Sequence, residues 1–205
     1  MAFLRSSIGQ EGVHTVRGRG VLLRPAVMSD YGPWAELRAH SREHLTPWEP
    51  VWQRDELSRS SFRRRVRHYQ REARDDLGYA FLIFADAGDE LLGGLTLSNV
   101  RRGVTQSAIV GYWLGLPHVG NGHMTEAVRA AAGFAFDELS LHRLEAATMP
   151  NNTASIRVLE RNGFRPEGTA RRLLKINGVW EDHLLHGLLA EEFADFARPL
   201  EGPAA

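Results

Sequence analysis

The stretch Gly111-Tyr-Trp-Leu-Gly-Leu-Pro-His-Val-Gly-Asn-Gly-His-Met-Thr125 decides the fold of this chain. Its first residues alternate between two faces, which predicts a strand, and Pro117 followed by Gly120 and Gly122 ends that pattern. Apolar residues then recur at helical spacing as far as about Leu139. A strand, a glycine turn and a helix start gather free backbone N–H groups at the positive end of a helix, which predicts an anion site. The same glycines also fit an ordinary strand-to-helix turn that needs them only for its geometry.

The composition is typical of one globular domain, with 205 residues of which 43% are hydrophobic. Lys+Arg and Asp+Glu both number 25, so the net charge of zero disfavours a protein that coats nucleic acid or a membrane surface. The absence of cysteine excludes disulfides, thiolate metal sites and a cysteine nucleophile. Neither a run of about 18 apolar residues nor a signal-peptide core is present, so we expect a cytoplasmic protein.

The pattern along the chain predicts a mixed α/β domain at 20–197, between an N-terminal arm at 1–19 and a C-terminal tail at 198–205. A meander of antiparallel strands leads into a β-α-β unit, which a hairpin follows. The expected strands lie at 21–25, 79–84, 91–100, 106–114, 142–149, 169–176 and 179–188. The expected helices lie at 29–39, 55–76, from Gly122 to about Leu139, after Asn151-Asn152, and at 190–197.

Two segments each allow two interpretations. Trp48 and Glu49 lie between two prolines, so they form either a rigid pocket wall or a surface loop with Trp48 in the core. The helix at 55–76 carries arginines around an apolar stripe, which suggests either a nucleic-acid or ribosome contact or a solvated face. We favour the solvated face, because Glu56, Glu72 and Asp75 are neighbours of these arginines. The arginines are Arg59, Arg63, Arg64, Arg67, Arg71 and Arg74.

The glycine turn does not match the common nucleotide-binding motifs. A dinucleotide fold needs a third glycine where Thr125 stands, and its acidic residue belongs at a strand's carboxyl end, whereas Glu145 lies mid-strand. A P-loop is excluded because no Gly-Lys-Ser/Thr follows the turn.

In their order and spacing, several motifs resemble the GNAT superfamily of N-acetyltransferases, and within it the ribosomal-protein-alanine branch. The resemblance covers residues from about Val21 to Leu189. It implies a GNAT-like fold, in which a central, mostly antiparallel mixed sheet contains a β-α-β coenzyme-binding core and is flanked by helices. The motifs are Leu45-Thr-Pro-Trp-Glu-Pro, Ser98-Asn-Val-Arg-Arg-Gly, Gly111-Tyr-Trp-Leu-Gly, Gly120-Asn-Gly-His-Met, Met149-Pro-Asn-Asn-Thr-Ala-Ser, Leu159-Glu-Arg-Asn-Gly-Phe and Asn177-Gly-Val-Trp-Glu-Asp-His.

The resemblance implies acetyl-CoA as the co-substrate. The glycine turn would hold its pyrophosphate, and its pantetheine arm would lie between two splayed strands, with a backbone N–H near Trp113 or Leu114 holding the oxyanion. The chain departs from the usual motif at Pro117, where many members have Gln or Arg. The implied coenzyme-binding residues are Trp113, Leu114, Val119, Gly120, Asn121, Gly122, His123, Met124, Thr125 and Asn152.

Catalysis needs a neutral amine and a proton for the leaving thiolate. Many family members use a tyrosine as the acid, but Leu159 stands at its place, and the resemblance implies Ser155 instead. Ser155 also fits a first-turn helix serine that bonds the backbone. A carboxylate acting through water suffices as the base for an α-amine. Glu49 is our first choice, with Glu181 or Asp182 as alternatives, and the spacing of His, Asp and Glu predicts no metal.

We therefore predict an acetyl-CoA-dependent N-acetyltransferase whose acceptor is an N-terminal α-amine, such as that of a ribosomal protein. We expect no membrane or direct nucleic-acid partner, and a monomer or homodimer. The first alternative is an enzyme that acetylates a small amine, an amino acid or an antibiotic. The second is a non-catalytic coenzyme-A-binding regulatory module, which only the missing tyrosine supports.

Overall fold

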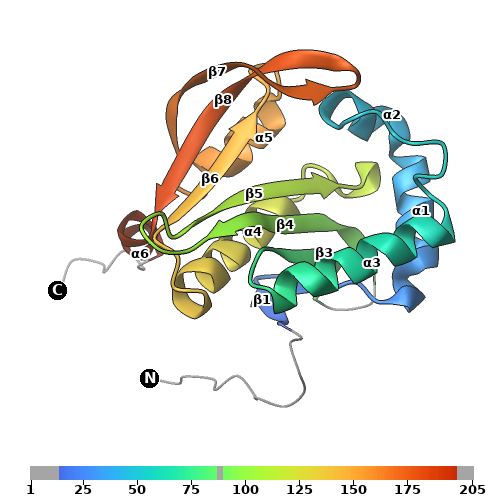
Figure 1. The fold of residues 1–205 in the computed structure, drawn as a ribbon, viewed down its shortest axis with the longest axis horizontal. Coiled ribbons are helices and arrows are strands. Elements are labelled where there is room, and N and C mark those ends of the chain that lie inside the picture. The colour runs from blue at the N-terminus through green and yellow to red at the C-terminus, as the bar shows by residue number, and fades with distance from the viewer. Residues whose placement is uncertain (1–13, 87–89, 198–205) are drawn as a thin grey trace.

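The computed structural model describes residues 14–86 and 90–197, which form one eight-stranded sheet flanked by helices (Figure 1). The strand order is β1-β2-β3-β4-β5-β6-β8-β7, and only β5 and β6 are parallel neighbours. This confirms the predicted mostly antiparallel mixed sheet. The strands are β1 (Val16–Gly18), β2 (Val21–Arg24), β3 (Tyr79–Ala85), β4 (Leu91–Arg101), β5 (Ser107–Leu114), β6 (Arg143–Thr148), β7 (Arg165–Ile176) and β8 (Val179–Leu189).

Helices cover both faces of the sheet. The α-helices are α1 (Tyr31–His40), α2 (Arg42–Leu45), α3 (Arg59–Arg74), α4 (His123–Gly133), α5 (Thr153–Glu160) and α6 (Ala190–Ala197). The shorter turns are η1 (Met28–Asp30), η2 (Thr46–Trp48), η3 (Leu116–His118) and the π-helix η4 (Phe134–Glu138). In the part of the chain that is described, no helix has the length and apolar character needed to cross a membrane.

Strand β3 is an almost continuous apolar run because helices pack on both of its faces. Phe81 and Ile83 pack in the cluster that contains the apolar face of α4. Leu82 and Phe84 face the opposite way and pack with Trp34 of α1. Phe62 and Val66 of α3 complete this second cluster, so α3 and α4 lie on opposite faces of the sheet (Figure 1). A strand buried on both faces has a nearly continuous run of apolar residues, as β3 does.

Local signals place several element ends where we expected them. The Asn152 side chain accepts a hydrogen bond from the Ser155 N–H at 3.1 Å and so begins α5. Gly163 follows α5 in the left-handed conformation with φ of 82°. The Asn177-Gly178 hairpin joins β7 and β8 as predicted.

Other boundaries differ from the predictions. The N-terminal arm is shorter than 1–19, because Val16–Gly18 pair with β2; residues 1–13 and the tail at 198–205 lie outside the described residues. The predicted helix at 55–76 is shorter, because the Ser58 side chain caps α3 at Ser61. The predicted loop at 44–50 contains the end of α2 and the turn η2. The helix after Gly122 changes to η4 at Phe134, and β7 begins at Arg165 rather than 169.

Candidate active site

The two central parallel strands diverge beside the glycine turn. β5 and β6 pair only through Ser107–Ile109 and Arg143–Glu145, although β5 continues to Leu114 and β6 to Thr148 (Figure 1). The opposite edge of β5 stays paired with β4 as far as Leu114. The β5 edge that faces β6 therefore has unpaired backbone groups from Val110 onward, where an extended amide chain can add like a strand.

A groove of about 580 Å³ lies between the end of β5, the start of α4 and the start of α5. Its lining includes every predicted coenzyme-binding residue except Asn121, together with Glu49, Tyr112, Ser155, Arg157 and Arg161. Trp48 is half-buried and lines the groove, which agrees with the pocket-wall interpretation of its loop. The backbone N–H of Asn177 donates to the Glu49 carbonyl at 2.9 Å, so the β7–β8 hairpin holds this wall in place.

The glycine turn has the geometry of an anion site. Gly120 and Gly122 have φ values of 83° and 81°, a region that glycine adopts without strain. A Cβ atom at either position would meet nothing within 4 Å, so the space above the turn is open. Gly122 is the N-cap of α4 and offers no side-chain cap, which leaves the first N–H groups of α4 available. These residues fit a pyrophosphate group.

A tyrosine that the sequence analysis did not single out joins Ser155. The Tyr112 hydroxyl and Ser155 Oγ lie 2.8 Å apart, and the Tyr112 hydroxyl also donates to the Ser155 carbonyl at 3.2 Å. Burial raises the pKa of Tyr112 to about 12, although the hydrogen bond with Ser155 opposes this shift. The hydroxyl of Ser155 thus bonds Tyr112 rather than only the backbone of its own helix. The alternation along β5 was the available signal, because it places Tyr112 with Val110 and Leu114 on the face of the sheet that packs against α4.

A second cavity of about 600 Å³ lies between the sheet, α1, α3 and the segment after η2, and it shares Glu49, Tyr112 and Trp113 with the groove. The Glu49 carboxylate accepts two hydrogen bonds from Arg38, each of 2.7 Å, and one of 2.7 Å from Trp52. Arg38 is only 5% exposed. Its guanidinium lies 4.5 and 4.9 Å from the ring centroids of Trp52 and Trp113. Glu49 is therefore where we expected it, but both of its oxygens are engaged, which favours a positioning role; its role as a base stays a prediction.

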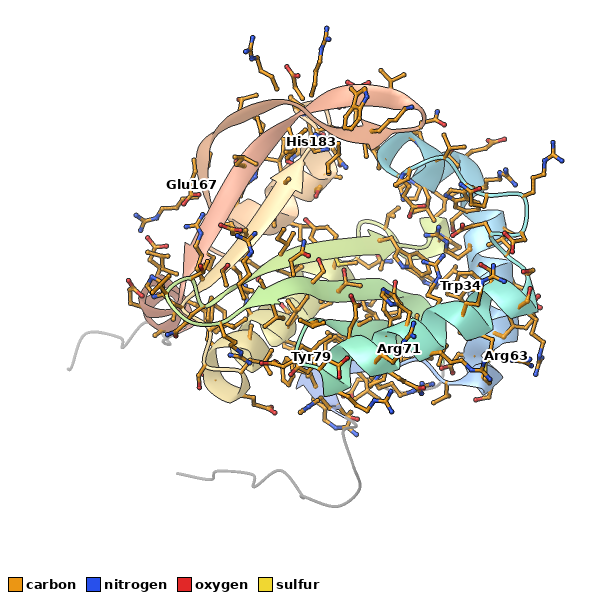
Figure 2. All side chains as sticks on the ribbon, in the orientation of Figure 1. Trp34, Arg63, Arg71, Tyr79, Glu167 and His183 are labelled. Atoms are coloured by element: carbon orange, nitrogen blue, oxygen red, sulfur yellow. The ribbon has the colours of Figure 1, made fainter. Side chains whose placement is uncertain are left out.

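The alternative bases lie on β8 beside a buried histidine. Asp182 is exposed and accepts from the Arg172 backbone N–H at 2.8 Å, and neither Asp182 nor Glu181 lines the groove or the second cavity. His183 lies on β8 (Figure 2) and is 3% exposed. It lines a cavity of about 190 Å³ together with Tyr112 and Ser155. The His183 Nδ1 lies 2.9 Å from the Glu181 carbonyl, which can only accept, so the neutral ring carries its proton on Nδ1. This leaves His183 Nε2 as a proton acceptor, which the sequence analysis missed.

The described part of the chain contains no group of three or more His, Cys, Asp or Glu side chains that could hold a metal ion. The site brings together an anion-binding turn, an open strand edge and a hydroxyl pair at the junction of two cavities. Such a site can hold a ligand that combines phosphate groups with an extended, amide-containing arm.

Comparison with known proteins identifies the family. Residues 21–165 match the family model described as acetyltransferase (GNAT) domain, so the chain belongs to this family. The predicted resemblance and the prediction of an N-acetyltransferase are thereby confirmed.

Three similar proteins are informative. The probable N-acetyltransferase YjcK of Bacillus subtilis (strain 168) is 40% identical over 174 residues, which cover 85% of this chain and 96% of that protein. The ribosomal protein uS5 alanine N-acetyltransferase of Escherichia coli (strain K12) is 32% identical over 169 residues, covering 82% of this chain and 87% of that protein. The structure of Mycobacterium smegmatis RimJ in complex with CoA-disulfide has a TM-score of 0.81, with 37% identity and 88% of each chain covered.

Proposed function

We propose that this chain transfers the acetyl group of acetyl-CoA to the N-terminal α-amine of a protein, such as a ribosomal protein. Family membership and the complex of its M. smegmatis structural neighbour with CoA-disulfide support the donor. The glycine turn and the first turn of α4 would hold the pyrophosphate, and the open edge of β5 would pair with the pantetheine arm. Arg157 of α5 and Arg161, the residue directly after α5, also line the groove and would add positive charge for a phosphate group.

One observation carries the choice of acceptor: the second cavity has no free carboxylate. Its acidic residues are Glu49 and Glu56, and each is paired with an arginine, Arg38 at 2.7 Å and Arg65 at 2.6 Å. A polyamine or an aminoglycoside carries several positive charges, which need unpaired negative partners when they leave water. An N-terminal peptide brings one amine followed by neutral amide groups, and so it matches a cavity whose charges are already balanced.

Two buried donors in the same cavity also favour a peptide. The Nε atoms of Arg38 and Arg65 are buried and have no hydrogen-bond partner among the described residues. Buried polar groups of a folded protein nearly always have partners, so such donors indicate where a ligand oxygen binds. The carbonyl groups of the first acceptor residues would satisfy them, while Trp34 and Phe62 offer apolar walls for a side chain.

The acceptor amine would meet the acetyl group where the two cavities join, beside Tyr112 and Trp113. Acetyl-CoA supplies an activated acetyl thioester there. The amine must lose a proton, but with a pKa of about 7.7–8.0 roughly a tenth of it is neutral at pH 7. His183 lines the neighbouring cavity of about 190 Å³, which contains Tyr112 and Ser155 as well. We propose that His183 Nε2 accepts this proton through water, and that Glu49 holds Arg38 and Trp52 in place.

The leaving thiolate would take a hydrogen bond from Ser155, whose hydroxyl is in turn bonded by Tyr112. With a pKa of about 12 for Tyr112 against about 8.5 for a thiol, complete proton transfer from Tyr112 would cost about 5 kcal/mol. The pair therefore stabilises the thiolate by hydrogen bonding, and the final proton comes from solvent. This arrangement supplies the hydroxyl that Leu159 lacks, which removes the sole support for a non-catalytic module.

A thiol-release assay with acetyl-CoA tests this proposal. The acceptors would be short peptides that begin with Ala, Ser or Met, spermidine, free amino acids and an aminoglycoside. We expect release with an Ala- or Ser-starting peptide and none when its α-amine is blocked. Release with spermidine or the aminoglycoside alone would contradict the proposed acceptor but not the acetyl transfer.

A further inference from the structure

Helix α3 has two faces with different properties. Phe62 and Val66 are buried in the second core cluster, and Arg65 and Tyr69 line the cavity proposed for the acceptor. The opposite face is exposed and strongly basic. Along its 16 residues α3 has seven arginines and one acidic residue, Glu72, although the whole chain has no net charge.

Most of the basic charge on this face is not neutralised by neighbours. Arg64 pairs with Asp55, Arg65 pairs with Glu56, and Glu72 pairs with His68. The arginines without a carboxylate within 4.0 Å, among the described residues, and without a ring partner are Arg63, Arg67, Arg71 and Arg74. The solvated-face interpretation relied on Glu56, Glu72 and Asp75 as partners, and none of these pairs with the four. Figure 2 shows Arg63 and Arg71 at separate turns along this helix.

The face also forms a hollow without acidic lining. It measures about 510 Å³ and is lined by Arg64, Arg67, His68, Gln70, Arg71 and Arg74. With a rise of 1.5 Å per residue, the four unpaired arginines extend over roughly 16 Å. A single phosphate would reach only one or two of them. A ligand that uses the whole row must be an extended chain with repeated negative charges.

We infer that the outer face of α3 binds the phosphate backbone of RNA. Guanidinium groups form paired hydrogen bonds with phosphate oxygens, and the helix carries arginine but no lysine. Protein–protein interfaces have an apolar core, whereas nucleic-acid interfaces are polar and positively charged. The lining of this hollow contains no apolar side chain, which favours nucleic acid over an acidic protein.

The position of α3 links this surface to the acceptor cavity. Its inner face forms a wall of that cavity, so RNA on its outer face lies one helix diameter, about 10 Å, from the proposed acceptor. An N-terminus that emerges from an RNA-bound protein would thus be presented at the site. This consequence rests on the proposed function, whereas RNA binding itself does not and can be tested separately.

The test measures the anisotropy of a fluorescent 20-nucleotide single-stranded RNA with the full chain over a range of salt concentrations. Contacts by the four arginines predict a slope of log Kobs against log[salt] of about −2.8, which is roughly 50-fold weaker binding at 200 mM than at 50 mM salt. The variant R67Q/R71Q/R74Q keeps only Arg63 of this row, so its slope should fall to about −0.7. The control R171Q/R172Q/K175Q removes the same charge from exposed positions of β7, across the molecule from α3, and should keep the slope of the parent chain (Figure 1).

Each outcome decides the inference. Salt-dependent RNA binding that only the α3 variant loses supports it. No RNA binding, equal losses in both triple variants, or tighter binding of poly-glutamate or of phosphatidylserine vesicles would overturn it. Both variants should acetylate a free peptide as fast as the parent chain, so failure of RNA binding is distinguishable from failure of the proposed function.

Discussion

Replacing Glu49 by Gln separates a positioning role from a catalytic base. In the parent chain the carboxylate accepts two N–H groups from Arg38 and one from Trp52, all at 2.7 Å. Gln offers one oxygen, and its NH₂ group would face a donor. The loss of one charge-assisted hydrogen bond costs roughly 1.5–3 kcal/mol, and the uncompensated charge of a guanidinium that is 5% exposed raises the total to about 3 kcal/mol or more. For a chain of this size we expect Tm to fall by about 6–12 °C.

Thermal unfolding and the pH dependence of kcat would be measured on the same preparations. We expect Glu49→Gln to melt earlier but, at a temperature where it is folded, to keep the acidic limb of its pH profile. Asp55→Asn is the matched control, because it breaks a carboxylate–arginine pair whose side chains are 52% and 64% exposed, and it should change Tm little. An unchanged Tm together with an about 100-fold lower kcat and the loss of the acidic limb would refute this reasoning and make Glu49 the base.

Four further predictions concern the groove and β8. Tyr112→Phe should lower kcat about tenfold without changing the KM for acetyl-CoA. Adding Ser155→Ala to this variant should lower kcat little further, because the two hydroxyls act as a pair. Additive losses of kcat in the thiol-release assay would contradict this. Gly122→Val should weaken coenzyme binding by calorimetry and cost about 1–2 kcal/mol of stability, because its φ is 81°, while Gly133→Ala on α4 should do neither. His183→Gln should lower kcat about 100-fold without changing the KM for acetyl-CoA; an unchanged kcat would exclude His183 as the base. Burial lowers the pKa of His186, so the folded chain takes up its proton less readily than the unfolded chain. Stability should therefore fall as the pH drops below about 6.5, and His186→Gln should lessen that fall in urea unfolding measured at several pH values.

Features of the fold that depend on local chemistry were predictable. The glycine turn, the Asn152 cap and the left-handed Gly163 each follow from what one residue type does to its neighbours. The three-residue strand β1 carries too short a pattern to recognise, and it forms because its partner β2 lies beside it. The change from α4 to the π-helix η4 leaves the apolar spacing of the sequence nearly unaltered, so the pattern predicted one helix.

The candidate site also has a part that the sequence could predict and a part that it could not. The turn that lines the groove is continuous in sequence, so its residues could be named together. The pairs that define the chemistry join distant residues: Tyr112 and Ser155 are separated by 43 positions, and Arg38 and Glu49 by 11. The family resemblance pointed to Ser155 and the rigid loop between two prolines pointed to Glu49, but only the fold shows which partner each one has.

The basic face of α3 shows a limit of composition. A net charge of zero led us to expect no direct nucleic-acid partner. The net charge does not show how charges are distributed, and seven of the arginines lie on one helix. The arginine pattern was visible in the sequence. What it did not reveal was which carboxylates neutralise which arginines, because Asp55 and Glu56 reach Arg64 and Arg65 from nine positions away.

The central claim is tested most directly by locating the acetyl group on a product. The acceptor would be a peptide that begins with Ala and contains one internal lysine, incubated with acetyl-CoA and this chain and then sequenced by tandem mass spectrometry. We predict acetylation of the α-amine and none of the lysine. Acetyl groups on the lysine, or on neither amine while spermidine in a parallel reaction is modified, would contradict N-terminal acetylation.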